Sequence, residues 1–456
     1  MIGLDTVLDS QERTVGFNLK REEGDMKAKT RIMAGLVICM FLLLAGLLPS
    51  GAHGKEVTAQ KPIVLGWVLS LSGPMAGLGI DAYKPALALV EHINKEGGIA
   101  GHPVKLIFAD TESDATKGVI AAKRLVMKDK VHMLLGDTSL GVAIPVGLAA
   151  SQFKIPHLVH TGSEAFGMQM KKAGKEAHHW NFAVIGVMVY DMMTVVAKWS
   201  KTVGTKVGVL YPDSAFGKAC SGLFMKLAPK YGLEIALTSS YPMNATVFGP
   251  QIAAIKGKPD LDVLVFTGAE FATGLCIAAV REAGITLPIG TESAMISAEI
   301  LKVGKIRKAY QMAPTIMVSG GASDGFWETL PPDDPRRPVI TEWSALHEKF
   351  VGRKMSSARE AYAFGTLHLL KDVWGRLLKD QPDILDKDLA SIRAAARDYT
   401  ETVKNVIVSS GATVSMSPED HLGLIPGTCF MLARFRDPPP HQVVPGFEMA
   451  PPPWRR

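Results

Sequence analysis

The sequence predicts an α/β protein with two lobes, each built on a doubly wound parallel sheet. Apolar runs that are too short for stable helices alternate with longer helical segments, and polar turn residues close each run. Strands buried on both faces of a parallel sheet have this appearance. The alternation lapses into a polar segment over 171–180 and then begins again on the same plan. A repeated cycle of this kind indicates two lobes rather than one large sheet.

The clearest unit of the first lobe is VHMLLGDTSLGVAIPVGLAASQFKIPHLVHTGS, residues 131–163. The run 131–135 ends at a glycine and predicts a buried strand. A helix is predicted over 140–153, and a second short strand over 158–159. Strand, helix and strand in this order form a βαβ unit, whose strands are parallel.

The other elements follow from the same alternation. In the first lobe the sequence predicts strands at 63–71 and 104–110, and helices at 81–94 and 115–129, the latter behind Asp114 as N-cap. The segment 310–320 is predicted as the strand that returns to this lobe, and three further helices complete it. In the second lobe we expect helices at 190–199, 217–231, 247–256 and 272–283, and strands at 206–213, 234–239, 261–268 and 287–293.

Composition excludes several classes of protein. Of the 456 residues, 47% are hydrophobic and 21% charged, which is typical of a globular protein with sizeable cores. The net charge is +6, but no block of basic residues is interleaved with aromatic ones, so no nucleic-acid-binding surface is indicated. The four cysteines have no CxxC spacing, which supports neither a zinc site nor a disulfide framework.

The first 54 residues are predicted to be an upstream extension followed by a signal peptide. Basic residues at 27, 29 and 31 precede an apolar run over 32–48, and the small-residue sequence Ala52-His53-Gly54 follows. Cleavage is expected after Gly54, with Met26 as the start of a signal peptide of ordinary length. A membrane anchor is the alternative, although about 17 apolar residues is at the lower limit for spanning. The mature protein is therefore expected in the periplasm.

Hydroxyl side chains follow two successive strands of the first lobe. Thr138 and Ser139 come after the first of these strands, and Thr161 and Ser163 come after the second. Ligands of parallel sheets bind beyond the carboxyl ends of the strands. Hydroxyls beside a helix N-terminus suit a small anionic group such as a carboxylate. The alternative is that these residues only cap helices.

No pattern indicates catalysis, a cofactor or a metal. The sequence Gly77-Leu78-Gly79 lacks the third glycine of a dinucleotide-binding turn, and neither GxxxxGK[ST] nor GxSxG occurs. No histidine has a carboxylate or cysteine at ligand spacing, so the histidines are interpreted as ordinary polar or capping residues. Cys220 and Cys276 lie on predicted helices, where they read as small buried residues that could pair if the fold brings them close.

An ordered set of short segments resembles one known family over about residues 60–436. The chain is similar to type I periplasmic binding proteins of the leucine/isoleucine/valine-binding class, the extracytoplasmic receptors of ABC importers. The segments that carry the resemblance are SGPMAGLG (72–79), INKEGGIAGHPVKLIFAD (93–110), LLGDTSLGVA (134–143), IPHLVHTGS (155–163), YPDSAFG (211–217), AVREAGITLPIGTES (279–293) and SPEDHLG (417–423).

The resemblance implies two lobes joined by a three-strand hinge, with a small ligand held between them and no chemistry performed. Lobe 1 would comprise 60–183 and 318–425, and lobe 2 would comprise 184–317 and 426–436. A Pro-rich tail over 437–456 would follow, extended or disordered.

The ligand contacts of the family fall on named positions of this chain. In lobe 1 they are Thr138 or Ser139, which would take the ligand carboxylate. The turn formed by Thr161, Gly162 and Ser163 would take part in the same contact and, through a backbone carbonyl, share the amino group. In lobe 2 the matching positions are Glu292, which would pair with the amino group, and Phe216.

The sequence departs from the family pattern at several of these positions. Leu78 stands where an aromatic is expected, and Ala269 or Glu270 stands where another is expected. Leu140 replaces a further hydroxyl, and Phe216 lacks the hydroxyl of a tyrosine. These departures predict a pocket of different shape from that of a branched-chain amino-acid receptor.

The function expected from these observations is a non-enzymatic solute-binding subunit that delivers an amino acid or related small carboxylate to an ABC permease in the inner membrane. Two alternatives stay open. One is a ligand-sensing receptor of the same fold, and the other is a receptor for an aromatic or organic acid without an amino group. No cofactor and no nucleic-acid partner are expected.

Overall fold

The computed structural model describes residues 60–159, 163–183, 189–292, 298–320, 332–353, 355, 358–423, 430–434 and 442–443. The predicted extension and signal peptide lie outside these residues, as do the turn 160–162 and most of the predicted tail. Among the described helices, none is both long and apolar enough to cross a membrane.

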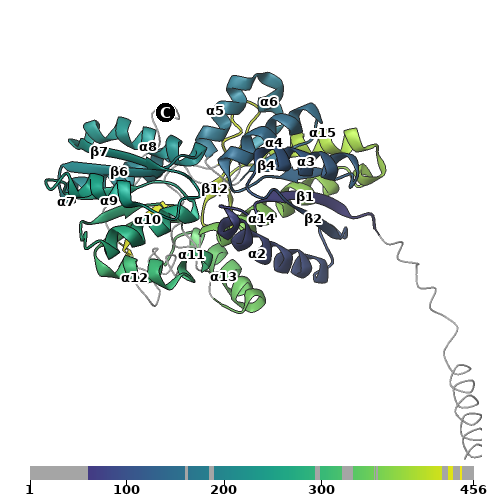
Figure 1. The fold of residues 1–456 in the computed structure, drawn as a ribbon. Helices are drawn as coiled ribbons and strands as arrows, with labels where there is room; N and C mark the ends of the chain where they lie inside the picture. The colour runs from purple at the N-terminus through teal and green to yellow at the C-terminus, as the bar shows by residue number, and fades with distance from the viewer. Residues whose placement is uncertain are drawn as a thin grey trace, which may run out of the picture. The chain divides into compact units, whose positions relative to one another are not determined.

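The first lobe is built on a five-stranded sheet in the order β2-β1-β3-β4-β5 (Figure 1). All of its strands are parallel. Its strands are β1 (Ile63–Leu69), β2 (Val104–Asp110), β3 (Met133–Leu135), β4 (His157–Val159) and β5 (Asn181–Ala183). The helices between them are α2 (Ala76–Lys95), α3 (Ala115–Met127), α4 (Leu140–Gln152), α5 (Ser163–Ala173) and α6 (Lys175–His179).

Both faces of this sheet are covered by apolar side chains. Val68 and Leu134 pack with α3 and α4 residues on one face, whereas Trp67 and Leu135 belong to the larger core on the other. The short strands can be apolar throughout because neither face meets water. The indole Nε1 of Trp67 donates a hydrogen bond to the Gly136 carbonyl at 3.1 Å. That bond holds the turn after β3 against β1.

The second lobe is built on a seven-stranded sheet in the order β14-β13-β10-β9-β8-β6-β7. It is parallel except that β13 runs antiparallel to both of its neighbours. Its strands are β6 (Lys206–Pro212), β7 (Glu234–Tyr241), β8 (Val263–Phe266), β9 (Ile289–Thr291), β10 (Thr315–Gly320), β13 (Phe430–Arg434) and β14 (Gln442–Val443). Its helices are α7 (Val189–Val203), α8 (Ala215–Leu227), η1 (Ala228–Tyr231), α9 (Gly249–Lys256), α10 (Phe271–Glu282), α11 (Ala298–Leu301) and α12 (Gly304–Met312).

Three long helices late in the chain return to the first lobe. They are α13 (Arg336–Val351), α14 (Ala358–Asp380) and α15 (Leu389–Glu401), with η4 (Ile384–Asp386) between the last two. Both α13 and α14 pack on α2. The buried guanidinium of Arg393 in α15 donates to the carbonyl of Val131 at 2.9 Å. A small hairpin of β11 (Val406–Ile407) and β12 (Thr413–Val414) follows.

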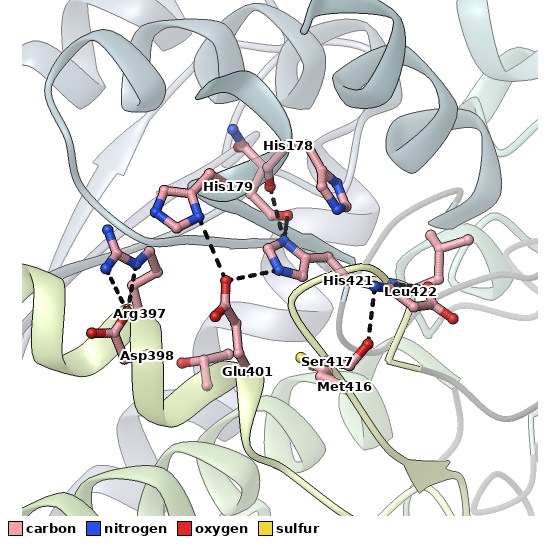
Figure 2. Close-up of polar contacts among 12 residues, drawn as sticks. His178, His179, Arg397, Asp398, Glu401, Met416, Ser417, His421 and Leu422 are labelled. Carbon is pink, nitrogen blue, oxygen red and sulfur yellow. Dashed lines mark hydrogen bonds and ion pairs between the residues drawn. The ribbon is translucent and has the colours of Figure 1, made fainter. Parts of the chain in front are cut away.

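The chain therefore passes between the lobes three times, after β5, after β10 and after residue 423. Two of these crossovers begin side by side. The amide of Ala183 donates to the His421 carbonyl, and the amide of Gly423 donates to the Ala183 carbonyl. Figure 2 shows how His421 is fixed there. Its ring stacks between His178 and Phe182, and its Nε2 lies 3.1 Å from Glu401.

The predicted fold class is confirmed, and the differences lie in particular segments. The segment 310–320, expected to return to lobe 1, instead forms β10, which pairs with β9 and β13 in the second sheet. The lobe-1 range therefore cannot begin at 318. The polar segment around 171–180, expected to be a linker, forms the end of α5 and the whole of α6, because Phe166 and Met170 in α5 and Ala177 in α6 are buried. Helix α2 begins at Ala76, five residues before the predicted start, and α11 and α12 were not predicted.

Candidate functional site

A buried polar network closes the carboxyl ends of three adjacent strands of the first sheet, β2, β1 and β3. The Oγ of Ser70 after β1 donates to the Asp137 carboxylate at 2.9 Å, and the Oγ1 of Thr111 after β2 donates to it at 2.7 Å. The backbone amide of Ser139 donates to the same carboxylate at 2.6 Å. Burial raises the pKa of Asp137 to about 6, although these hydrogen bonds favour its ionised form. Asp137 therefore fixes the turn that presents Thr138 and Ser139.

Helix α4 begins directly after this turn. Ser139 is its N-cap residue, but its side chain makes no capping hydrogen bond. The alternative that this serine only caps the helix is therefore not what the structure shows. The first amides of an α-helix have no acceptor within the helix, so the start of α4 offers N–H donors beside the half-buried Ser139. Thr138 is 2% exposed.

Leu78 lies in the first turn of α2 and is 1% exposed. The next residue, Gly79, lies so close to β1 that a Cβ there would be 2.0 Å from the Ser70 carbonyl oxygen. The start of α2 is thus pressed against the strand end that supplies a hydroxyl to Asp137. An aliphatic side chain at 78 packs in the core of this lobe.

The other predicted ligand contacts of lobe 1 are in the segment that leads into α5. Thr161 and Gly162 lie outside the described residues. Ser163 is the first residue of α5, and its side chain is not described. The next residue, Glu164, is buried, and its carboxylate accepts hydrogen bonds from the amides of Val189 and Tyr190 at 2.6 and 2.9 Å. This acid joins α5 of the first lobe to the beginning of α7 in the second.

In the second lobe the predicted residues also lie at carboxyl ends of strands. Phe216, 5% exposed, stands in the first turn of α8, which is capped by Ser214 through a 2.9 Å hydrogen bond from the amide of Gly217. Glu292 directly follows β9 and is fully buried. Its charge, together with burial, raises the pKa of Tyr310 in α12. Tyr310 and Glu292 are therefore near neighbours.

Helices of the two lobes contact each other. Helix α4, which begins after Ser139, packs beside α8, which carries Phe216. Helix α11, which follows Glu292 along the chain, packs beside α2, which carries Leu78. Elements that carry predicted site residues of one lobe thus contact elements of the other. This arrangement provides hydroxyls and helix amides from one lobe and a buried acid from the other.

Sequence reasoning missed three features of this region. It did not identify the Asp137 network, although Ser70 and Thr111 each directly follow a predicted strand, which is the signal that could have found them. It treated Glu270 only as a missing aromatic, whereas the structure places this residue in a buried position, 1% exposed. It also missed Tyr310, because α12 was not predicted.

Residues set aside from the sequence have structural roles where they are described. His157 is buried, with its Nδ1 2.8 Å from the Asn181 side chain. Cys220 and Cys276 are buried and do not form a disulfide with each other. Trp180 packs against the guanidinium of Arg397, 4.6 Å from its ring centroid. Within the described ranges, no group of His, Cys, Asp and Glu side chains is arranged to hold a metal ion.

Comparisons with known proteins agree with this architecture. Residues 62–435 match the family model described as periplasmic binding protein. A Leu/Ile/Val-binding protein homologue of Brucella melitensis is 29% identical over 251 residues, which cover 55% of this chain and 66% of the relative. The chain thus spans slightly less than two thirds of that relative's length.

Solved structures give a broader match. An extracellular ligand-binding receptor from Rhodopseudomonas palustris HaA2 is 25% identical with a TM-score of 0.71, covering 84% of this chain and 100% of the receptor. A solute-binding protein of an ABC transporter from R. palustris, solved with 4-hydroxybenzoate, has 17% identity and a TM-score of 0.67, covering 87% and 99% of the two chains. The latter likeness concerns the fold alone.

Proposed function

The chain belongs to the periplasmic binding protein family, in its leucine/isoleucine/valine-binding class, and from this premise we propose that it is the solute-binding subunit of an ABC importer. Proteins of this family and fold bind solutes and are non-enzymatic. Its ligand is an amino acid or a related small carboxylate held between the two lobes. The residues proposed to contact it are Leu78, Thr138, Ser139, Thr161, Gly162, Ser163, Phe216 and Glu292.

The observation that carries this proposal is that the carboxyl strand ends of one lobe offer hydrogen-bond donors and those of the other lobe carry a buried acid. The start of α4 offers amides and the uncapped hydroxyl of Ser139, and α4 packs beside α8 of the other lobe. Glu292, fully buried after β9, supplies an anion in that other lobe. A zwitterion matches both, because its carboxylate suits a helix N-terminus and its ammonium suits an acid. Each charge-assisted hydrogen bond contributes about 1.5–3 kcal/mol.

Binding between lobes also provides a means of reporting occupancy. A solute that contacts both lobes stabilises the conformation in which both sets of contacts are made. A permease that recognises this conformation would receive loaded protein in preference to empty protein. A membrane-bound sensor could use the same signal, so a receptor without transport is the second reading of the same arrangement.

Two observations bear on which solute this chain binds. The Brucella relative is named for leucine, isoleucine and valine, whereas the R. palustris protein of the same fold was solved with 4-hydroxybenzoate. Glu292 favours a solute with an amino group, because an ammonium forms a charge-assisted hydrogen bond with a carboxylate. Export through the predicted signal peptide, with cleavage after Gly54, would place the protein in the periplasm.

A thermal-shift panel tests the proposal. Neutral, acidic and dibasic amino acids and aromatic and aliphatic acids would each be added to the mature protein. At least one carboxylate solute is expected to raise the melting temperature, since a ligand at 100 times its Kd adds about 2.7 kcal/mol. If no carboxylate raises it, the proposed function is wrong.

The Glu292→Gln variant then identifies the role of the acid by calorimetry. Affinity for an amino-bearing solute should fall by about tenfold or more, because the ammonium loses its charged partner. The control is Glu234→Gln, which makes the same change at an exposed residue that begins β7. Equal affinities of the two variants would exclude an ammonium contact at Glu292.

A further inference from the structure

Glu270 lies at the carboxyl edge of the second sheet. It follows β8, which lies between β9 and β6 in the sheet order. Glu292 follows the neighbouring strand β9. Burial raises the pKa of Tyr241, at the end of β7, and the nearby Glu270 contributes to this rise. Burial likewise raises the pKa of Tyr310, and Glu292 contributes there. The two acids and the two tyrosines thus form one buried group at this edge.

The hydrogen bonds of Glu270 leave one carboxylate oxygen unused. Glu270 is 1% exposed, and its carboxylate interacts with the Ser214 side chain and with the backbone amides of Ala269 and Glu270, but its Oε2 has no hydrogen-bond partner in the described chain. Glu270 also stands at the N-cap of α10 without making a capping hydrogen bond. The usual structural role of an acid at a helix start is therefore not performed here.

The unused oxygen lies directly against the backbone of Gly268. Gly268 has a φ of +112°, and a Cβ at this position would lie 2.4 Å from the Pro212 side chain and 2.7 Å from Oε2 of Glu270. A glycine is required there by the backbone conformation and by the close approach of this oxygen. A buried carboxylate oxygen without a partner costs free energy, which a bound cationic group would offset.

Neighbouring groups also connect Glu270 to the proposed binding site. Ser214, its hydrogen-bonding neighbour, caps α8, and α8 packs beside α4 of the first lobe. Phe216, a proposed ligand contact, stands two residues after Ser214. Glu270 is therefore connected through Ser214 to the helix of lobe 2 that packs beside α4.

We propose that Glu270 is a specificity-determining residue that binds a second cationic group of the solute. The preferred solutes are then small carboxylic acids with two basic groups, that is, dibasic amino acids. This inference rests on the proposed function and narrows its ligand class. Glu292 binds the α-ammonium, and Glu270 binds the basic group of the side chain. An aliphatic side chain or an aromatic ring at the same place would bury the Oε2 atom without a partner.

Calorimetry on the wild-type mature protein provides the first test. Lysine and norleucine share a carboxylate, an α-ammonium and a linear side chain, but only lysine carries a terminal ammonium. At least one of lysine, ornithine (which has a shorter side chain) and arginine (which has a guanidinium) should bind at least about tenfold tighter than norleucine. If norleucine or leucine binds as tightly as all three, the inference is overturned while the proposed function stands. If no carboxylate solute binds, the proposed function itself has failed.

The Glu270→Gln variant provides the second test, with Glu282→Gln at the exposed end of the same helix as the matched control. Glu270→Gln should lower the affinity for the dibasic solute by about tenfold or more and leave that for norleucine within about threefold. Its melting temperature without solute should equal or exceed that of the wild type, because a buried unpaired charge is removed. A destabilised variant with unchanged solute preference would show that Glu270 is structural and would overturn the inference.

Discussion

Single residues at the strand ends determine what the proposed site can bind. Asp137 accepts hydrogen bonds from Ser70, Thr111 and the amide of Ser139, and thereby sets the turn from which α4 begins. The amide of Ser139 donates to Asp137, and its hydroxyl makes no capping hydrogen bond to α4. An internal acid that is fully bonded to its neighbours thus prepares the hydroxyl and the helix amides for an external anion.

Gly79 gives a prediction at the residue scale. A Cβ at this position would lie 2.0 Å from the Ser70 carbonyl oxygen, so Gly79→Ala must displace either α2 or the end of β1. The free energy of unfolding should fall by about 1–3 kcal/mol, measured by urea denaturation.

The matched control is Gly375→Ala in α14, where nothing lies within 4 Å of the added Cβ. This change should raise the free energy of unfolding by up to about 1 kcal/mol, because alanine is the better helix former. Equal effects of the two substitutions would contradict the close packing of α2 against β1.

The sequence predicted which residues lie at the strand ends better than it predicted the contacts around them. Thr138, Ser139 and Glu292 were identified from strand ends and from resemblance, and the structure places each of them at such an end. Their roles as ligand contacts stay predictions. The buried state of Glu270 could not be predicted, because it depends on the approach of Ser214 and Gly268 from two different loops.

At the scale of elements, α5 and α7 are joined by one carboxylate. Glu164 in α5 accepts hydrogen bonds from the first two amides of α7, and these helices belong to different lobes. A helix N-terminus favours an anion, yet burial dominates and raises the pKa of Glu164 to about 7. The contact therefore titrates near neutral pH.

A pH dependence of stability follows from this shift. Glu164 has a pKa near its ordinary value of 4.5 in the unfolded chain and about 7 in the folded one. The folded state thus keeps a proton that the unfolded state has lost, and this group's contribution to stability falls as pH rises from about 4.5 to about 7. The difference corresponds to about 3 kcal/mol.

The measurement is urea denaturation at pH 5, 6 and 8 of the wild type and of Glu164→Gln. The wild type should lose more stability than the variant across this interval, because only the wild type has the titrating carboxyl. Comparison with the variant cancels the contributions of other buried groups, such as His157. Parallel pH profiles would show that Glu164 does not titrate in this range.

Helices and strands were predicted correctly where the hydrophobic pattern was strong. They were missed or assigned to the wrong sheet where contacts between distant residues determine the structure. Strand β2 matches its predicted bounds, and Asp114 caps α3 as expected. The helices α5 and α6 were missed because their exposed faces are polar and Gly174 separates them. The sheet to which β10 belongs could not be read locally, since it is fixed by pairing with β9 and with the distant β13.

At the scale of the whole molecule, two sheets are connected by three crossovers of the chain. A strand–helix alternation specifies each sheet, but the placement of one sheet's edge against the other depends on contacts between residues far apart in sequence. The contact of α4 with α8 and that of α2 with α11 are of this kind. Each contact joins an element that carries a predicted site residue of one lobe to an element of the other lobe.

A crystal structure of the mature protein with the tightest-binding solute of the panel tests the central claim most directly. The account predicts one solute between the lobes, with its carboxylate at the start of α4 beside Thr138 and Ser139 and its amino group facing Glu292. A solute held by one lobe alone, or a carboxylate that points away from α4, would contradict it.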